Sequence, residues 1–190
     1  GLTPPASALG ATARKAAAEA ARIGFPVALK IVSPQASHKT EVGGVALGLA
    51  DEPAVIAAAE EMAARLAALE PESIVEGFLV QEMVSGVEMI LGVREDPQFG
   101  PFMVAGLGGV TVEAMRDIAF RMLPLTAGEA QGMLDELRGK ALLGAFRGRP
   151  PRDIAALIAA MVGLSDLFLD HRAHLADLEV NPLIVGGAGE

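Results

Sequence analysis

Three strand-like runs follow one another in the middle of the chain with only tight turns between them. The runs are Phe78–Val84, Glu88–Val93 and Phe102–Ala105, and the turns are Ser85-Gly86 and Asp96–Pro101. Parallel neighbours need a crossover of about a dozen residues or more, whereas antiparallel neighbours need only a short turn. The spacing therefore predicts mixed or antiparallel sheets and disfavours a doubly wound parallel sheet.

Helices and further strands alternate on either side of these runs. Helices are predicted at Thr12–Arg22, Pro53–Leu69, Thr126–Leu137 and Asp153–Leu169, and strands at Val27–Val32, Val45–Leu49, Ile118–Leu123 and, as one or two short strands, Asp177–Val185. This order predicts an α+β fold with the helices on one face of the sheets.

Composition limits the kinds of partner. The 190 residues include 24 acidic and 15 basic side chains, for a net charge of -9. Nucleic acid and anionic membranes both attract basic surfaces, so neither is expected as a partner. The chain has no cysteine, which excludes disulfides and Cys-based zinc sites. The longest apolar run, around Ile154–Leu164, ends at Ser165-Asp166, so we expect no membrane-spanning helix and a cytoplasmic protein.

Lys30 is one of four lysines in the chain, and it lies in the apolar run Val27–Val32. An ammonium group in a buried strand is costly unless an anion meets it. Two interpretations fit this pattern. Lys30 either points at the phosphates of a nucleotide or reaches past the edge of the strand into water.

The loop Ser37–Gly44 gathers several reactive or flexible residues. Gly43 and Gly44 permit backbone geometries that suit a phosphate-binding or moving loop. The neutral imidazole of His38 can act near pH 7 as a base or as a phosphoryl acceptor. The alternative is a solvent-exposed loop with an incidental histidine.

Two further segments carry weaker signals. Gly106–Gly109 is a glycine-rich segment that either binds phosphate or simply turns, and it matches neither a Walker A nor a Rossmann pattern. Alternation along Asp177–Leu183 places Asp177, Glu179 and Asn181 on one face of a strand. Oxygen ligands of this kind suit Mg²⁺, although a half-exposed polar strand face gives the same pattern.

Six segments together resemble one family. They are Pro26–Lys30, Ser37–Val45, Val80–Met83, Phe99–Pro101, Gly106–Gly109 and Glu179–Leu183. In this order they resemble the ATP-grasp domain of the ADP-forming acyl-CoA synthetases, the acetate–CoA ligase (ADP-forming) type, which is related to the β subunit of succinyl-CoA synthetase. The resemblance covers nearly the whole chain. It implies an ATP-grasp fold whose two α+β lobes, roughly residues 12–84 and 85–190, hold the nucleotide between two sheets.

The resemblance also implies roles for single residues. The implied nucleotide-binding residues are Lys30, Lys39, Gln81, Glu82, Met83 and Glu88, with a phosphate loop at Gly43, Gly44, Gly108 and Gly109 and a Mg²⁺ ligand at Asn181. Two residues would be catalytic. His38 would carry the phosphoryl group as a second phosphohistidine, and Glu179 would lie near that group. ATP or ADP and Mg²⁺ are the implied cofactors.

The implied reaction is acyl-CoA + ADP + phosphate ⇌ acid + CoA + ATP, for a small-molecule acyl substrate. The resemblance makes the CoA-binding (α-type) region the partner, in cis or as a separate subunit. Since this sequence lacks that region, we expect a fragment of a longer synthetase that is inactive alone. The family pattern also continues with a strand that ends in a metal-binding Asp, whereas this sequence stops at Glu190.

Two alternative functions remain open. The weaker is an ATP-grasp ligase with a different acceptor, which the His38 loop disfavours. Non-catalytic regulatory modules fused to protein lysine acetyltransferases resemble this region equally well. The presence of Lys30, His38 and Glu179 favours the catalytic interpretation.

Overall fold

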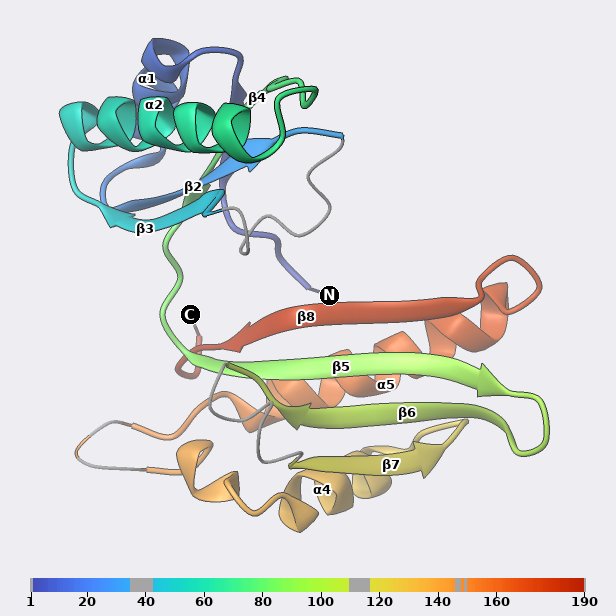
Figure 1. Ribbon diagram of the computed structural model, residues 1–190. Coiled ribbons are helices and arrows are strands. Elements are labelled where there is room, and N and C mark those ends of the chain that lie inside the picture. The colour runs from blue at the N-terminus through green and yellow to red at the C-terminus, as the bar shows by residue number, and fades with distance from the viewer. Residues whose placement is uncertain (1, 35–42, 110–116, 146–147, 149, 190) are drawn as a thin grey trace. The chain divides into compact units, whose positions relative to one another are not determined.

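A computed structural model describes residues 2–34, 43–109, 117–145, 148 and 150–189. The chain divides into two units, Thr3–Val84 and Ser85–Glu190. Each unit has its own four-stranded sheet and its own helices (Figure 1). All strand pairs in the two sheets are antiparallel, which confirms the α+β prediction made from the short turns.

The first unit has the strand order β1-β4-β2-β3. Its elements are β1 (Ser7–Gly10), α1 (Ala13–Ile23), β2 (Val27–Val32), β3 (Val45–Leu49), α2 (Glu52–Leu69) and β4 (Gly77–Glu82). Figure 1 shows α1 and α2 on the same face of this sheet. Strand β1 was not predicted, because Ser-Ala-Leu-Gly has neither β-branched residues nor alternation, and it forms by pairing with β4.

Both helices of the first unit begin at a capping side chain. Thr12 accepts a hydrogen bond from the backbone N–H of Lys15, and Asp51 accepts one from that of Ala54. Their buried faces form a core with the inward residues of β2 and β4. This core contains Ala16, Ala17, Ala20, Val27, Leu29, Ile31, Val55, Ala59, Met62, Leu66, Phe78 and Val80.

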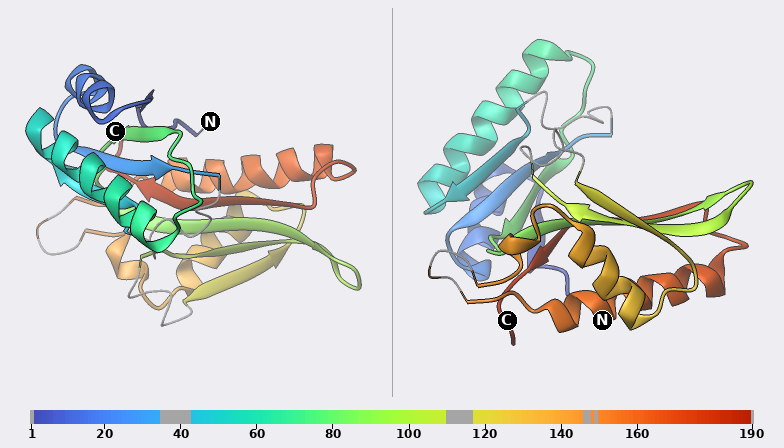
Figure 2. Two further views of the ribbon diagram at one scale, coloured as in Figure 1. Left: turned by 45° about the horizontal axis from the view of Figure 1, so that its top comes forward. Right: turned by 90° about the horizontal axis from the view of Figure 1, so that it is seen from below.

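The second unit has the strand order β7-β6-β5-β8. Its elements are β5 (Val87–Asp96), β6 (Gly100–Leu107), β7 (Ile118–Met122), α4 (Ala127–Glu136), the 3-10 turn η1 (Lys140–Leu142), α5 (Ile154–His171) and β8 (Asp177–Val185). Helices α4 and α5 lie on one face of the sheet in all views (Figures 1 and 2). Their apolar residues pack against the inward residues of β5, β6 and β7 in a second core.

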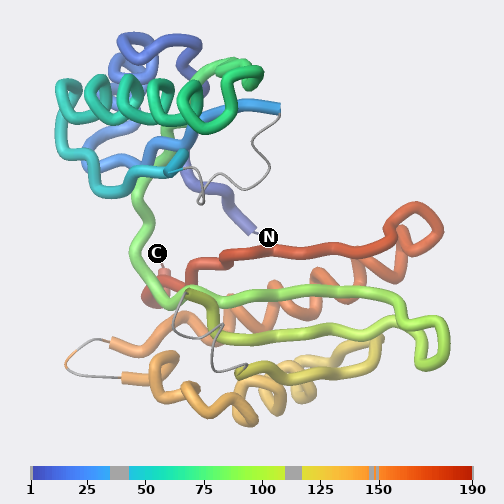
Figure 3. Tube along the Cα trace, in the orientation of Figure 1, coloured from blue at the N-terminus to red at the C-terminus, as the bar shows by residue number. Residues whose placement is uncertain are grey.

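A tight turn closes the β5–β6 hairpin (Figure 3). The Asp96 carboxylate accepts hydrogen bonds from the backbone N–H groups of Gln98 (2.8 Å) and Phe99 (2.9 Å). Gly100 then takes φ of 87°, a left-handed conformation that glycine adopts without steric cost. Asp and Gly at these two positions explain why the turn could be predicted from the sequence.

Helix α5 corrects the expectation that the apolar run ends at Ser165 and Asp166. The helix continues past these residues and is 18 residues long in total. With a mean hydropathy of 1.6, it is long and apolar enough to cross a membrane by length and composition alone. Leu157 and Phe168 nevertheless lie in the core of the second unit. Buried Ser165 accepts a hydrogen bond from the Leu125 N–H at 3.0 Å. One side of α5 therefore packs in the core of the second unit.

Two carboxylates stabilise α4 and its attachment to β7. Thr126 and Glu129 form a reciprocal capping box, in which the hydrogen bond from Thr126 lowers the pKa of Glu129 below its ordinary value of 4.5. Arg121 on β7 pairs with Glu136 on α4, and this contact lowers the pKa of Glu136 in the same way. Lowered carboxyl pKa values favour the folded state above the ordinary pKa, and this advantage disappears as the pH falls through the lowered values.

We therefore expect the variant E129Q/E136Q to have a flatter acid profile than the wild type. Its free energy of unfolding should be lower at neutral pH and should decrease less between about pH 5 and about pH 3. Urea unfolding followed across this range measures the effect. D166N, which removes one carboxylate from the exposed side of α5, is the control for the loss of a negative charge as such. Parallel profiles for E129Q/E136Q and wild type would contradict the assignment.

Candidate functional site

In each unit, the sheet face opposite the helices presents predicted site residues. In β2, Leu29 and Ile31 point into the core, so Lys30 between them points to the other face. The Lys30 Nζ donates a hydrogen bond to Gln81 Oε1 at 2.8 Å, across the β2–β4 pair. This partner is a neutral amide oxygen, and the described residues place no carboxylate within ion-pair distance of Lys30. Among the described residues, none therefore neutralises the positive charge of Lys30.

The end of β4 carries the other residues predicted to recognise adenine. Glu82 Oε2 accepts a hydrogen bond from the Ala6 N–H at 3.1 Å, and the Glu82 N–H donates to the Ala6 carbonyl at 2.8 Å. The carboxylate and the backbone N–H of Glu82 thus both bond the backbone of Ala6, in the segment before β1. Met83 follows, with 38% of its surface exposed. Both Glu82 and Met83 are therefore accessible to a ligand.

The glycine pair before β3 packs against its own unit. Gly43 has φ of 64°, and a Cβ there would lie 2.0 Å from Arg65 Nη1. The Gly44 carbonyl accepts a hydrogen bond from the Ile31 N–H at 2.8 Å. This pair thus continues the β2–β3 pairing at the end of the predicted loop. His38 and Lys39, the other predicted residues of that loop, lie outside the described residues.

Strand β8 has the predicted alternation. Asp177, Glu179 and Asn181 are exposed, whereas Leu178 and Val180 pack against the core. Asn181 Nδ2 donates a hydrogen bond to Glu179 Oε1 at 3.1 Å. The carboxylate and the amide predicted to act together are therefore in contact.

A bulge in β8 changes the direction of its side chains after Asn181. Asn181 and Pro182 together oppose the single residue Ile90 of β5, because Met89 pairs with Leu183 and Leu91 pairs with Val180. Leu183 then packs against the core again. Proline is tolerated here because a bulge does not need its missing N–H.

Glu88 lies beside the second glycine pair. The Gly108 N–H donates a hydrogen bond to the Glu88 carbonyl at 2.7 Å, and a Cβ at Gly108 would lie 3.0 Å from the Glu88 Cβ. A Cβ at Gly109 would lie 3.5 Å from Glu88 Oε2. Gly106 and Leu107 belong to β6, so the predicted loop begins only at Gly108. The structure thus brings together the predicted ribose ligand and part of the predicted phosphate loop.

Glu179 and Asn181, which are exposed on β8, offer two oxygen ligands to a metal ion. The described part of the chain contains no group of three or more histidine or acidic residues that could hold a metal. Mg²⁺ often takes only one or two protein carboxylates and completes its shell with water and substrate phosphates. The donor pair therefore fits a Mg²⁺ ion that arrives with a nucleotide.

Asp117 is a buried acid that the sequence analysis did not assign to a role. Its carboxylate accepts hydrogen bonds from the N–H groups of Arg138 and Gly139, both at 2.8 Å, and only 6% of the residue is exposed. These bonds tie the start of β7 to the turn after α4. No local pattern reveals this role, because the partners are 21 and 22 residues away.

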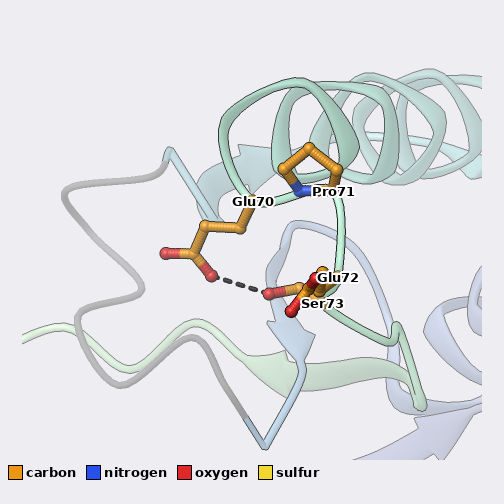
Figure 4. Close-up of a pocket in the computed structure, with 4 residues that line it drawn as sticks. All are labelled: Glu70, Pro71, Glu72 and Ser73. Atoms are coloured by element: carbon orange, nitrogen blue, oxygen red, sulfur yellow. Dashed lines mark hydrogen bonds between the residues drawn. The ribbon is translucent and has the colours of Figure 1, made fainter.

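One hollow lies apart from the predicted site residues. It is lined by Glu70, Pro71, Glu72 and Ser73, and the Ser73 Oγ donates to Glu70 Oε2 at 2.7 Å (Figure 4). The backbone N–H of Ser73 also donates to the Glu70 carbonyl. These contacts describe a closed turn after α2, whose polar groups already bond one another.

A model of the ATP-grasp domain matches residues 1–189. Acetate–CoA ligase [ADP-forming] I of Archaeoglobus fulgidus is 40% identical over 168 residues, which are 88% of this chain and 24% of the relative. Acetate–CoA ligase [ADP-forming] II subunit beta of Pyrococcus furiosus is 35% identical over 191 residues, which are 100% of this chain and 81% of the relative. The chain thus spans about a quarter of the first relative and most of the second.

Solved structures of one Ca. Korarchaeum cryptofilum protein, a dinucleotide-forming acetyl-coenzyme A synthetase, are also similar. A complex with coenzyme A and Ca-AMPCP has a TM-score of 0.87 and 40% identity, with 98% of this chain and 81% of that chain covered. A complex with coenzyme A and Mg-AMPPCP has a TM-score of 0.78 and 35% identity, over 98% and 80%. In the second, a phosphohistidine segment points towards the nucleotide-binding site. These matches confirm the predicted fold family.

The contact between Gly108 and Glu88 yields a stability prediction. Gly108→Ala should lower the free energy of unfolding by about 1 kcal/mol or more, because the new Cβ crowds the side chain and backbone of Glu88. Gly128→Ala is the matched control, since no atom lies within 4 Å of a Cβ there and α4 favours alanine. Urea unfolding of both variants checks the difference. If Gly108→Ala and Gly128→Ala have equal free energies of unfolding, the contact with Glu88 does not require glycine at position 108.

Proposed function

This chain belongs to the ATP-grasp family, and we propose that it is the nucleotide-binding, phosphoryl-transfer part of an ADP-forming acyl-CoA synthetase. The observation that carries the proposal is the helix-free face of the second sheet. That face presents Glu88, Glu179 and Asn181 from β5 and β8. Solved relatives bound to nucleotide analogues support the same class of ligand.

We propose that the two units are the two lobes of the ATP-grasp fold. In the first unit, Lys30 and Lys39 supply positive charge to the phosphates, while Gln81, Glu82 and Met83 recognise the base. Gly43 and Gly44 belong to the loop that carries His38. Support comes from the position of Lys30, whose ammonium is held by a neutral partner on the helix-free face. A positioned cation lowers the cost of bringing phosphate charges together.

In the second unit, Glu88 binds the ribose beside Gly108 and Gly109. Asn181 and Glu179 supply oxygen ligands for Mg²⁺, which neutralises phosphate charge when it is bound. Glu179 also lies near the transferred phosphoryl group. The 3.1 Å hydrogen bond between Asn181 and Glu179 supports this joint role, since it fixes one carboxylate oxygen, while no described residue bonds the other.

The proposed transfer step runs from a phosphohistidine to ADP. The bond between the imidazole nitrogen and phosphorus breaks, while a β-phosphate oxygen of ADP forms a new bond to the same phosphorus. The released imidazole takes up a proton and becomes neutral again. Such a step needs in-line positioning and charge neutralisation more than covalent help from the protein. His38 is the proposed carrier on this chain.

The partner in this proposal is a CoA-binding (α-type) region, either in the same polypeptide or as a separate subunit. The relatives occur both as long ligases and as a subunit beta, which supports either arrangement. The acyl substrate is a small molecule that meets the partner region. We propose a cytoplasmic location for the complex.

Mixing the chain with the CoA-binding chain of an ADP-forming acetate–CoA ligase tests the proposal. With acetyl-CoA, ADP, phosphate and Mg²⁺, we expect ATP to form and neither chain alone to produce it. Luciferase luminescence measures the ATP. A chain that binds ADP but produces no ATP would instead support the regulatory module. A chain that binds no nucleotide would contradict both functions.

The phosphohistidine role of His38 predicts a separation of binding from transfer. His38→Ala should abolish ATP formation and leave the Kd for ADP within a few-fold, because the imidazole carries the phosphoryl group and not the nucleotide. Lys30→Met is the matched comparison and should weaken ADP binding about tenfold, the typical effect of losing a charged hydrogen bond. Calorimetric titration measures both constants. If His38→Ala abolishes binding as well, the histidine is structural.

A further inference from the structure

A straight row of cross-strand partners crosses the second sheet. Glu179 on β8 pairs with Gly92 on β5, Gly92 pairs with Val104 on β6, and Val104 pairs with Phe120 on β7. Directly opposed residues of neighbouring strands point to the same face of a sheet. The row therefore runs from a carboxylate at one end to an aromatic ring at the other.

This row lies on the helix-free face. The chain neighbours of Gly92 are Leu91 and Val93, and both are buried in the core beneath the sheet. Side chains alternate along a strand, so position 92 points away from α4 and α5. Glu179 is exposed, and 52% of Phe120 is exposed as well. The row is thus open to a ligand.

Gly92 is the gap in this row, and neither backbone nor packing requires a glycine there. A Cβ at Gly92 would have no atom of the described residues within 4 Å, and its φ is outside the left-handed range. Gly106 on the neighbouring strand differs, because a Cβ there would lie 2.7 Å from Ile118 Cγ2 and 2.9 Å from the Asp117 carbonyl. Glycine in a strand interior destabilises the strand and often marks the close approach of a ligand.

Side chains surround the gap on four sides. Along β5 it lies between Ile90, which is half-buried, and Arg94, which is 3.5 Å from the Asp177 carboxylate. Across the sheet it lies between Glu179 and half-buried Val104. The bare backbone is therefore bordered by a polar side and an apolar side.

We propose that Gly92 is where the bound nucleotide comes closest to the second sheet. The proposal rests on the function proposed above and adds a residue to which that function gave no role. The phosphates of a nucleotide arrive with Mg²⁺, which a carboxylate such as Glu179 can bind, and the flat, weakly polar base suits the apolar border formed by Ile90 and Val104. The missing side chain provides the space for van der Waals contact between the ligand and the β5 backbone.

Size-graded substitution at this position tests the proposal. Gly92→Ala and Gly92→Val are titrated with ADP and Mg²⁺ by calorimetry, and their Tm values are measured without ligand. We expect the Kd to rise several-fold for alanine and at least tenfold for valine. Both Tm values should equal or exceed that of the wild type, because alanine and valine suit a strand better than glycine and meet no neighbour.

Gly163→Ala is the matched control. Gly163 lies on the exposed side of α5 with no atom within 4 Å of a Cβ and no left-handed φ. This variant should raise Tm and keep the wild-type Kd. If Gly92→Ala and Gly92→Val bind ADP as the wild type does, the proposal is wrong while the proposed function stands. If the wild type itself binds no ADP, both are wrong. If Gly92→Val lowers Tm, only the Kd of Gly92→Ala for ADP is used to judge the proposal.

Discussion

Burial of only one face of each sheet is the constraint on which the rest of the structure depends. Helices α1 and α2 cover one sheet and α4 and α5 the other, and alternate residues of the central strands β2, β4, β5 and β6 enter the cores. The residues between them must lie on the opposite face. Lys30 lies between two buried aliphatic residues, and Glu179 lies between Leu178 and Val180. The cores thus fix the positions of the polar side chains that the proposed function needs.

Glycines play different parts on and around this framework. Gly106 leaves room for Ile118, and Gly108 allows the chain after β6 to lie against Glu88. Gly43 lies against Arg65 in a left-handed conformation. Gly92 has no neighbour to accommodate in the part of the chain that the structure describes. A glycine-rich composition therefore says little about phosphate binding until the surroundings of each glycine are known.

The sequence predicted the features that depend on local chemistry. Short turns indicated antiparallel pairing, Thr126 marked the start of α4, and alternation placed Glu179 on an exposed face. Features that depend on distant partners could not be read in this way. Strand β1 exists through pairing with β4, and the hydrogen bond between Lys30 and Gln81 joins residues 51 positions apart. Register also reveals Gly92 opposite Glu179, which no motif indicates.

The two hydrophobic cores have no residue in common among the positions that the structure describes. Each core has its own helices and its own sheet, so a substitution in one core removes packing from one unit alone. Thermal denaturation of variants with a weakened first core, compared with variants with a weakened second core, then measures whether the two units unfold together.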